Sequence, residues 1–70
     1  MKASKAQIKY INDLNYNMYT DDLLNQLTVS TASKLIKVWR IYRFGNPVIP
    51  QMYDWIQQAE KEVFGKVIYQ

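Results

Sequence analysis

The chain contains no cysteine and no histidine, and it has only two glycines and two prolines. Without cysteine no disulfide can form, and without either residue the usual zinc sites are excluded. The nucleophile and base pairs of hydrolytic enzymes are missing, and so is a glycine-rich phosphate loop. We therefore expect neither an enzyme nor a bound metal or cofactor.

The six carboxylates do not form a pattern that favours catalysis. Asp21 and Asp22 are adjacent, and Glu60 and Glu62 are two residues apart. On a helix the two members of such a pair point to different sides, whereas general acid and base chemistry needs them together. The pair at 21 and 22 has a simpler role, because negative charge in the first turn of a helix is favoured by the helix dipole.

Long apolar runs are also absent. No stretch approaches the roughly 20 apolar residues of a membrane span, and the N-terminal residues lack the apolar core of a signal peptide. We expect no membrane partner and a cytoplasmic location, which would be the host cytoplasm for a phage-encoded chain. The 70 residues, 49% of them apolar, predict a single small domain over residues 1–70 with a limited core.

The residues from Thr28 to Gly45 are the part of the chain around which we expect the rest to pack. Their apolar side chains recur at the spacing of one helix face, so the pattern predicts a long helix at about residues 29–44. The face consists of Ala32, Leu35, Ile36, Trp39 and Tyr42, and Val38 widens it. Thr28 is a candidate N-cap, and Gly45 can take the left-handed backbone that ends a helix.

Shorter helices are predicted on both sides of the central one. Ser4 and Gln7 match a capping box that would open a helix over about residues 5–16, and Thr20 can cap a short helix that ends near residue 26. Pro50 suits the first turn of a last helix, which Gly65 would end. Together they predict an all-α fold of three or four helices, followed by a short β-prone tail at residues 66–69 that can either pack back on the helices or pair with Val48 and Ile49.

The apolar stripes of the first and last helices are predicted to pack on the central one. In the first helix this edge consists of Ile8, Ile11, Leu14 and Met18, while Asn12 faces water; in the last it consists of Met52, Ile56, Ala59 and Val63. Trp39 and Trp55 lie on the stripes of their helices, so we assign both to the core.

Positive charge is concentrated in the middle of the chain. Residues 23–53 carry four basic side chains and no acid, and these are Lys34, Lys37, Arg40 and Arg43. They follow one another at every third residue and form a basic ridge on the central helix. A cationic helix face attracts phosphate backbones, and Lys5 and Lys9 would extend it if the first helix lies alongside. The sequence thus suggests a nucleic-acid-binding module, with DNA favoured over RNA.

Apolar side chains that fall outside the central stripe suggest a second kind of interaction. Ile41 and Phe44 are rotated well away from Ala32, and Tyr42 is an aromatic neighbour of both. Such residues are either covered by another element or exposed for a partner or a second copy. We therefore name Ile41, Tyr42 and Phe44 as candidate partner-binding residues.

Two motif resemblances bear on function. The segment Leu27-Thr28-Val29-Ser30 resembles the Leu-Gly-Val-Ser turn of helix-turn-helix proteins, which would make the central helix a recognition helix. Residues 3–36 resemble small helical modules of phage and plasmid proteins with the pattern Ala-Ser/Thr-x-x-Gln-Ile-x-x-Ile-x-x-Leu, then Leu-Thr-x-x-x-Ala-Ser-x-Leu-Ile. The matching residues are Ala3, Ser4, Gln7, Ile8, Ile11, Leu14, Leu27, Thr28, Ala32, Ser33, Leu35 and Ile36.

The resemblance implies a compact helical module of a mobile genetic element, of a kind often associated with DNA handling. Two other functions stay open. The chain could be a phage-encoded, protein-binding inhibitor of a host defence system of the anti-CRISPR kind, or a homo-oligomeric accessory protein such as a homodimer.

Overall fold

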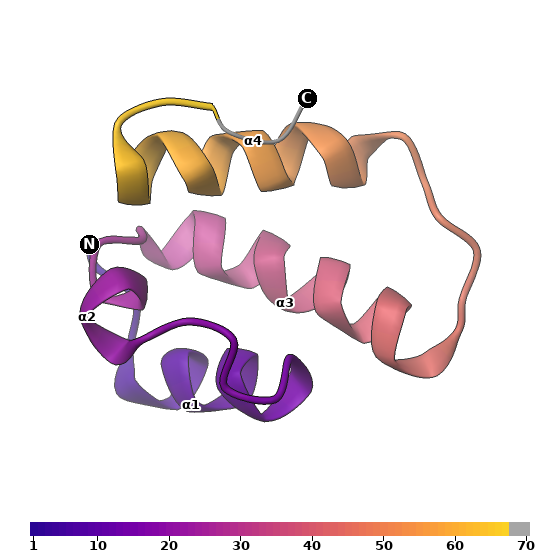
Figure 1. The fold of residues 1–70 in the computed structure, drawn as a ribbon, viewed down its shortest axis with the longest axis horizontal. Helices are drawn as coiled ribbons and strands as arrows, with labels where there is room; N and C mark the ends of the chain where they lie inside the picture. Colours follow the sequence, from indigo (N-terminus) through magenta and orange to yellow (C-terminus); the bar gives the residue numbers. More distant parts are fainter. Residues whose placement is uncertain (68–70) are drawn as a thin grey trace.

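The computed structural model describes residues 1–67, which form four helices and no strand. The helices are α1 (Lys5–Leu14), α2 (Asp21–Leu24), α3 (Val29–Phe44) and α4 (Gln51–Phe64). In Figure 1, α3 lies in the middle, with α1 and α4 on its two sides and α2 next to α1. The predicted all-α fold around a central helix at 29–44 is confirmed. Of the predicted β-prone tail at 66–69, residues 68 and 69 lie outside the described residues, and residues 66 and 67 are not in a strand.

The helix starts and stops follow the capping signals. The Ser4 hydroxyl accepts the Gln7 amide N–H at 3.1 Å, while the Gln7 side chain accepts the Ser4 N–H at 3.0 Å, which completes the capping box. Thr20 and Thr28 cap α2 and α3 through their hydroxyls. Gly45, with φ of 70°, ends α3 in the left-handed region, where glycine carries no Cβ penalty.

The first helix ends earlier than its sequence predicts. It stops at Leu14 rather than near residue 16, because Tyr16 and Asn17 take left-handed backbone with φ of 58°. Asn15 accepts the Met18 amide N–H with its side chain at 3.2 Å, which is the local competition that makes asparagine a poor helix residue. Met18 is therefore 60% exposed and does not belong to the apolar edge.

Two further differences concern α2 and Asn12 in the last turn of α1. The predicted end near residue 26 is replaced by a four-residue helix followed by tight turns, in which Leu27 donates to the Leu24 carbonyl at 3.1 Å. Asn12, expected to face water, is buried because its amide donates to the Asp21 carboxylate at 3.0 Å and joins α1 to α2.

All four helices contribute to the core. Its main cluster consists of Ile8, Ile11, Leu24, Leu27, Ala32, Leu35 and Ala59. Val38 and Met52 are fully buried as well. The two tryptophans are only half-buried, although Trp39 packs against the core cluster, and Tyr42 is 48% exposed, so the apolar face of α3 is not wholly covered.

Glu62 of α4 holds the beginning of α3. Its carboxylate accepts the Thr28 amide N–H at 2.9 Å and the Thr31 hydroxyl, and Gln58 donates to it at 3.4 Å. Burial raises the pKa of Glu62, but the hydrogen bonds from Thr31, Thr28 and Gln58 favour the ionised form more, so the net pKa lies below its ordinary value. A negative charge at the N-terminus of α3 is also favoured by the helix dipole.

This contact predicts that Glu62→Gln lowers the free energy of unfolding at neutral pH by about 1–2 kcal/mol, since a charged hydrogen-bond acceptor is lost. Because the folded-state pKa is depressed, the contribution is complete above the unfolded value near 4.5 and is lost as pH falls through the folded pKa. Urea unfolding of both proteins at several pH values checks this. The unfolding free energies of the two proteins should become equal at acidic pH. A difference that persists there would contradict the role of the ionised carboxylate.

Candidate functional site

Four basic side chains of α3 form what we call the cation strip: Lys34, Lys37, Arg40 and Arg43. Each follows the last by three residues, so each is rotated by about 60° from its predecessor, and the strip crosses half of the helix circumference. It runs diagonally from the α4 side of α3 to the α1 side.

The first two cations lie along the border with α4. The Lys34 ammonium donates to the Gln58 side-chain oxygen at 3.4 Å, and the Lys37 ammonium lies 5.9 Å from the centre of the Trp55 ring. Both partners are neutral. The lysine charges are thus positioned by α4 without being neutralised by it.

The other end of the strip reaches the loop after α1. The Arg43 guanidinium lies 4.6 Å from the centre of the Tyr16 ring, a cation–π contact. Tyr16 is 73% exposed because its left-handed backbone directs the ring outward, and Arg40 is exposed between the two ends. The strip therefore presents positive charge to solvent over its whole length.

Phe44 lies on the same side of α3 as the centre of the strip. It follows Lys37 by seven residues and Arg40 by four, which places the three side chains on one face, and it is 62% exposed. We call the surface of Lys37, Arg40 and Phe44 the outer face. An exposed aromatic ring beside two cations is a combination that contacts sugars and bases as well as phosphates.

The other predicted nucleic-acid residues do not join this face. Lys5 and Lys9 surround a separate hollow together with Asp13 and Asp21, on the side of α1 where Asn12 bonds to α2. Although α1 packs against α3, Lys5 and Lys9 lie near Asp13 and Asp21 and not near the cation strip. Their predicted role in binding remains a prediction.

Of the three predicted partner-binding residues, Ile41 and Phe44 are neighbours on the surface of α3, because they are three residues apart, whereas Tyr42 is rotated away from both. Ile41 follows Lys34 by seven residues, so it faces α4, where it is half-buried. Tyr42 lines a groove that is described next, and Phe44 belongs to the outer face. The structure thus separates Tyr42, which lines the groove, from Ile41 and Phe44.

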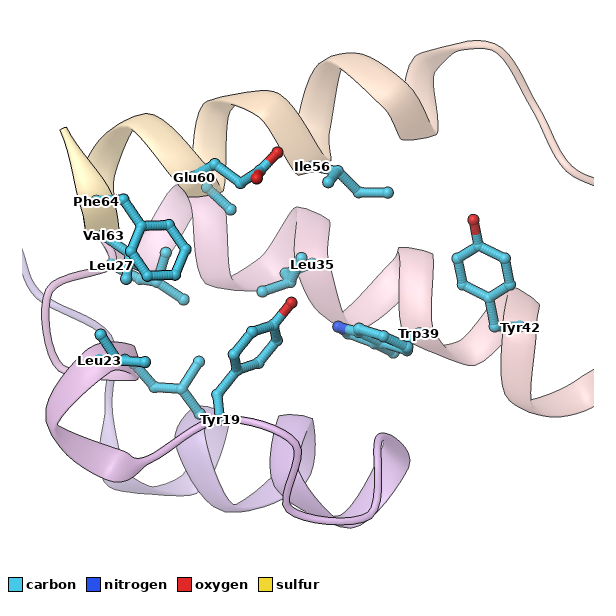
Figure 2. A pocket seen from close by; sticks show the side chains of 12 residues that line it. Tyr19, Leu23, Leu27, Leu35, Trp39, Tyr42, Ile56, Glu60, Val63 and Phe64 are labelled. Atoms are coloured by element: carbon cyan, nitrogen blue, oxygen red, sulfur yellow. The ribbon is translucent and has the colours of Figure 1, made fainter. Parts of the chain in front are cut away.

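A largely apolar groove of about 710 Å³ lies between α4 and the segment that contains α2, with α3 as its floor. Figure 2 shows Tyr19 and Leu23 on one side of the floor and Ile56 and Glu60 on the other. The lining consists of Tyr19, Leu23, Leu24, Leu27, Leu35, Trp39, Tyr42, Ile56, Ala59, Glu60, Val63 and Phe64.

Polar groups also line this groove. The indole N–H of Trp39 is buried and has no hydrogen-bond partner among residues 1–67. The Tyr19 ring packs edge-on against Trp39, with the ring centres 6.5 Å apart, and its hydroxyl points toward the same region (Figure 2). Burial raises the pKa of Tyr19, and the negative charge of Glu60 raises it further.

The groove and the outer face lie on opposite sides of α3. Residues that are two positions apart on a helix are rotated by about 200° relative to each other. Lys37 is two residues from both Leu35 and Trp39 of the groove floor, and Phe44 is two residues from Tyr42. One side of the molecule is therefore cationic and the other apolar.

The groove was not foreseen from the sequence. Leu35, Trp39 and Tyr42 read as a continuous core stripe, and no local signal shows that the distance between α4 and Tyr19 leaves part of that stripe uncovered. The helix-turn-helix interpretation also lacks a clear counterpart, since α2 is a single turn of four residues.

No helix within residues 1–67 combines the length and apolar character needed to cross a membrane. The same residues contain no group of three or more side chains suited to holding a metal ion. No protein-family model, curated protein or solved structure matches this chain. The resemblance to phage and plasmid modules therefore stays a prediction.

Proposed function

We propose that the protein binds nucleic acid, DNA in preference to RNA, through the cation strip of α3, the middle of which lies on the outer face. The observation that carries this proposal is the cation strip, three of whose four side chains contact neutral groups: Gln58, the Trp55 ring and the Tyr16 ring. Positive charges that are not paired with carboxylates remain available for phosphates. Binding would release the counterions condensed on those phosphates.

The spacing of the strip supports contacts along a backbone. Lys34 and Arg43 are nine residues apart, which corresponds to about 13 Å along the helix axis at 1.5 Å per residue. Each DNA strand carries one phosphate per about 3.4 Å of duplex axis, so cations spread over this length can reach several phosphates. Phe44 and Tyr16 add flat surfaces beside them, at 62% and 73% exposure.

Titration of a fluorescently labelled 20-base-pair DNA with the full chain at 50 mM salt tests this function. We expect saturable binding with a dissociation constant in the micromolar range, which is typical of contacts made mainly to phosphates. Tyr42→Ala, which changes the apolar groove on the opposite side, should leave the affinity unchanged. Absence of binding at this salt concentration would overturn the proposal.

A further inference from the structure

The apolar groove has the length of a short recognition helix. Its floor runs from Leu35 to Tyr42 of α3, and its wall runs from Ile56 to Phe64 of α4. At 1.5 Å per residue these distances correspond to about 10–12 Å, or about two helical turns. An occupant of that length can place two or three apolar side chains in the groove at the spacing of one helix face.

The floor of the groove also requires a hydrogen-bond acceptor. The Trp39 indole N–H is buried without a partner among the described residues, and an unpaired buried donor is destabilising. An occupant that brings an amide or hydroxyl oxygen to this position removes the cost. A purely apolar ligand would leave it in place.

The electrostatics of the groove differ from those of the outer face. Glu60 is the ionisable carboxylate in the lining, and its charge extends across the groove to the Tyr19 hydroxyl, whose pKa is raised first by burial and then by this charge. A negative field disfavours the phosphates of a nucleic acid here and favours an occupant with a basic side chain.

We propose that the groove binds an amphipathic α-helix of a partner protein, with apolar side chains along two turns, an oxygen acceptor for Trp39 and a basic residue near Glu60. This inference does not depend on nucleic-acid binding, because it uses residues on the other side of α3. It would make the protein an adaptor with one ligand on each side.

Selection from a phage-displayed library of 16-residue helical peptides against the full chain tests the proposal. We expect enriched peptides with apolar residues at i, i+4 and i+7 and at least one basic residue. The two indole N–H resonances give an internal readout: that of Trp39 should shift on peptide binding, while that of Trp55, which lies under Lys37, should not.

Two aromatic residues of α3 provide matched variants for the binding measurement. Tyr42→Ala in the groove should lower the affinity for the selected peptides by about tenfold or more, because it removes a central aromatic contact. Phe44→Ala on the outer face should leave that affinity within about twofold of the unchanged protein. Phe64→Ala, at the far end of the groove, is a second groove variant if Tyr42→Ala alters the circular dichroism spectrum.

Several outcomes would overturn the proposal. These are failure to enrich any peptide, enrichment of proline-rich extended peptides, or binding that Phe44→Ala weakens and the groove variants do not. A Trp39 resonance that shifts with protein concentration alone, together with a dimer in light scattering, would assign the groove to a second copy instead.

Discussion

Replacement of Lys37 and Arg40 together by alanine should weaken binding to duplex DNA by about tenfold to a hundredfold at 50 mM salt, because two of four phosphate contacts are removed. Both side chains belong to the outer face, and neither is buried, so the fold should be unaffected. The same change should reduce the slope of log affinity against log salt from about −3.6 to about −1.8, since each contact to B-DNA contributes about 0.9.

Lys5→Ala with Lys9→Ala is the matched control for this measurement. It removes the same net charge from a different place, beside Asp13 and Asp21. If position matters, as the geometry of the strip implies, this pair should leave the affinity close to that of the unchanged protein. An equal loss in both double variants would mean that total charge rather than position attracts DNA, which would contradict a defined outer face.

Ile11→Ala should abolish most of the folded population. Ile11 is fully buried in the core cluster, and truncation of a buried isoleucine costs about 2–5 kcal/mol through lost burial and the cavity left behind. A domain of this size without disulfide or metal has a total stability of only about 3–5 kcal/mol. The expected result in thermal unfolding followed by circular dichroism is a weak helical signal with no cooperative transition at room temperature.

Tyr10→Ala is the control for that variant, since it removes a larger side chain from the same helix at a position that is 42% exposed. It should change the free energy of unfolding by about 0.5 kcal/mol, as is usual for surface substitutions. If Ile11→Ala unfolds at the same urea concentration as the unchanged protein, the core does not depend on the contact between α1 and α3.

The starts and stops of the helices could be predicted because they depend on neighbouring residues. Ser4 with Gln7, Thr28 and Gly45 act within one turn of the helix that they begin or end, so their types and spacing suffice. The limits of α3 at Val29 and Phe44 agree with the prediction for this reason. The early end of α1 was predicted less accurately: the helix stops before two successive left-handed residues, Tyr16 and Asn17, where Asn15 accepts the Met18 amide N–H.

Features that require two elements were not predictable. Glu62 reads as one solvent-facing acid of the last helix, but α4 brings it to the first turn of α3, 34 residues from Thr28. Asn12 is buried because Asp21 of another helix accepts its amide. In both cases the partner is distant in sequence, and nothing in the local pattern indicates it.

The candidate site was predicted in part. The cations of the strip share one helix, so their relative directions followed from the helical period alone. How Lys5 and Lys9 lie relative to them depends on the rotation of α1 about its axis, and this is set by the burial of Ile8 and Ile11. The groove depends on the separation of Tyr19 from α4, which no periodicity determines.

The dependence of wild-type DNA affinity on salt concentration tests the central claim most directly. With four phosphate contacts, the affinity for the 20-base-pair duplex should fall by about two orders of magnitude between 50 and 200 mM salt, a slope of about −3.6. A slope near zero, or the absence of binding at 50 mM salt, would show that the cations of α3 are only an ordinary solvent-exposed helix face. The proposed function would then be wrong.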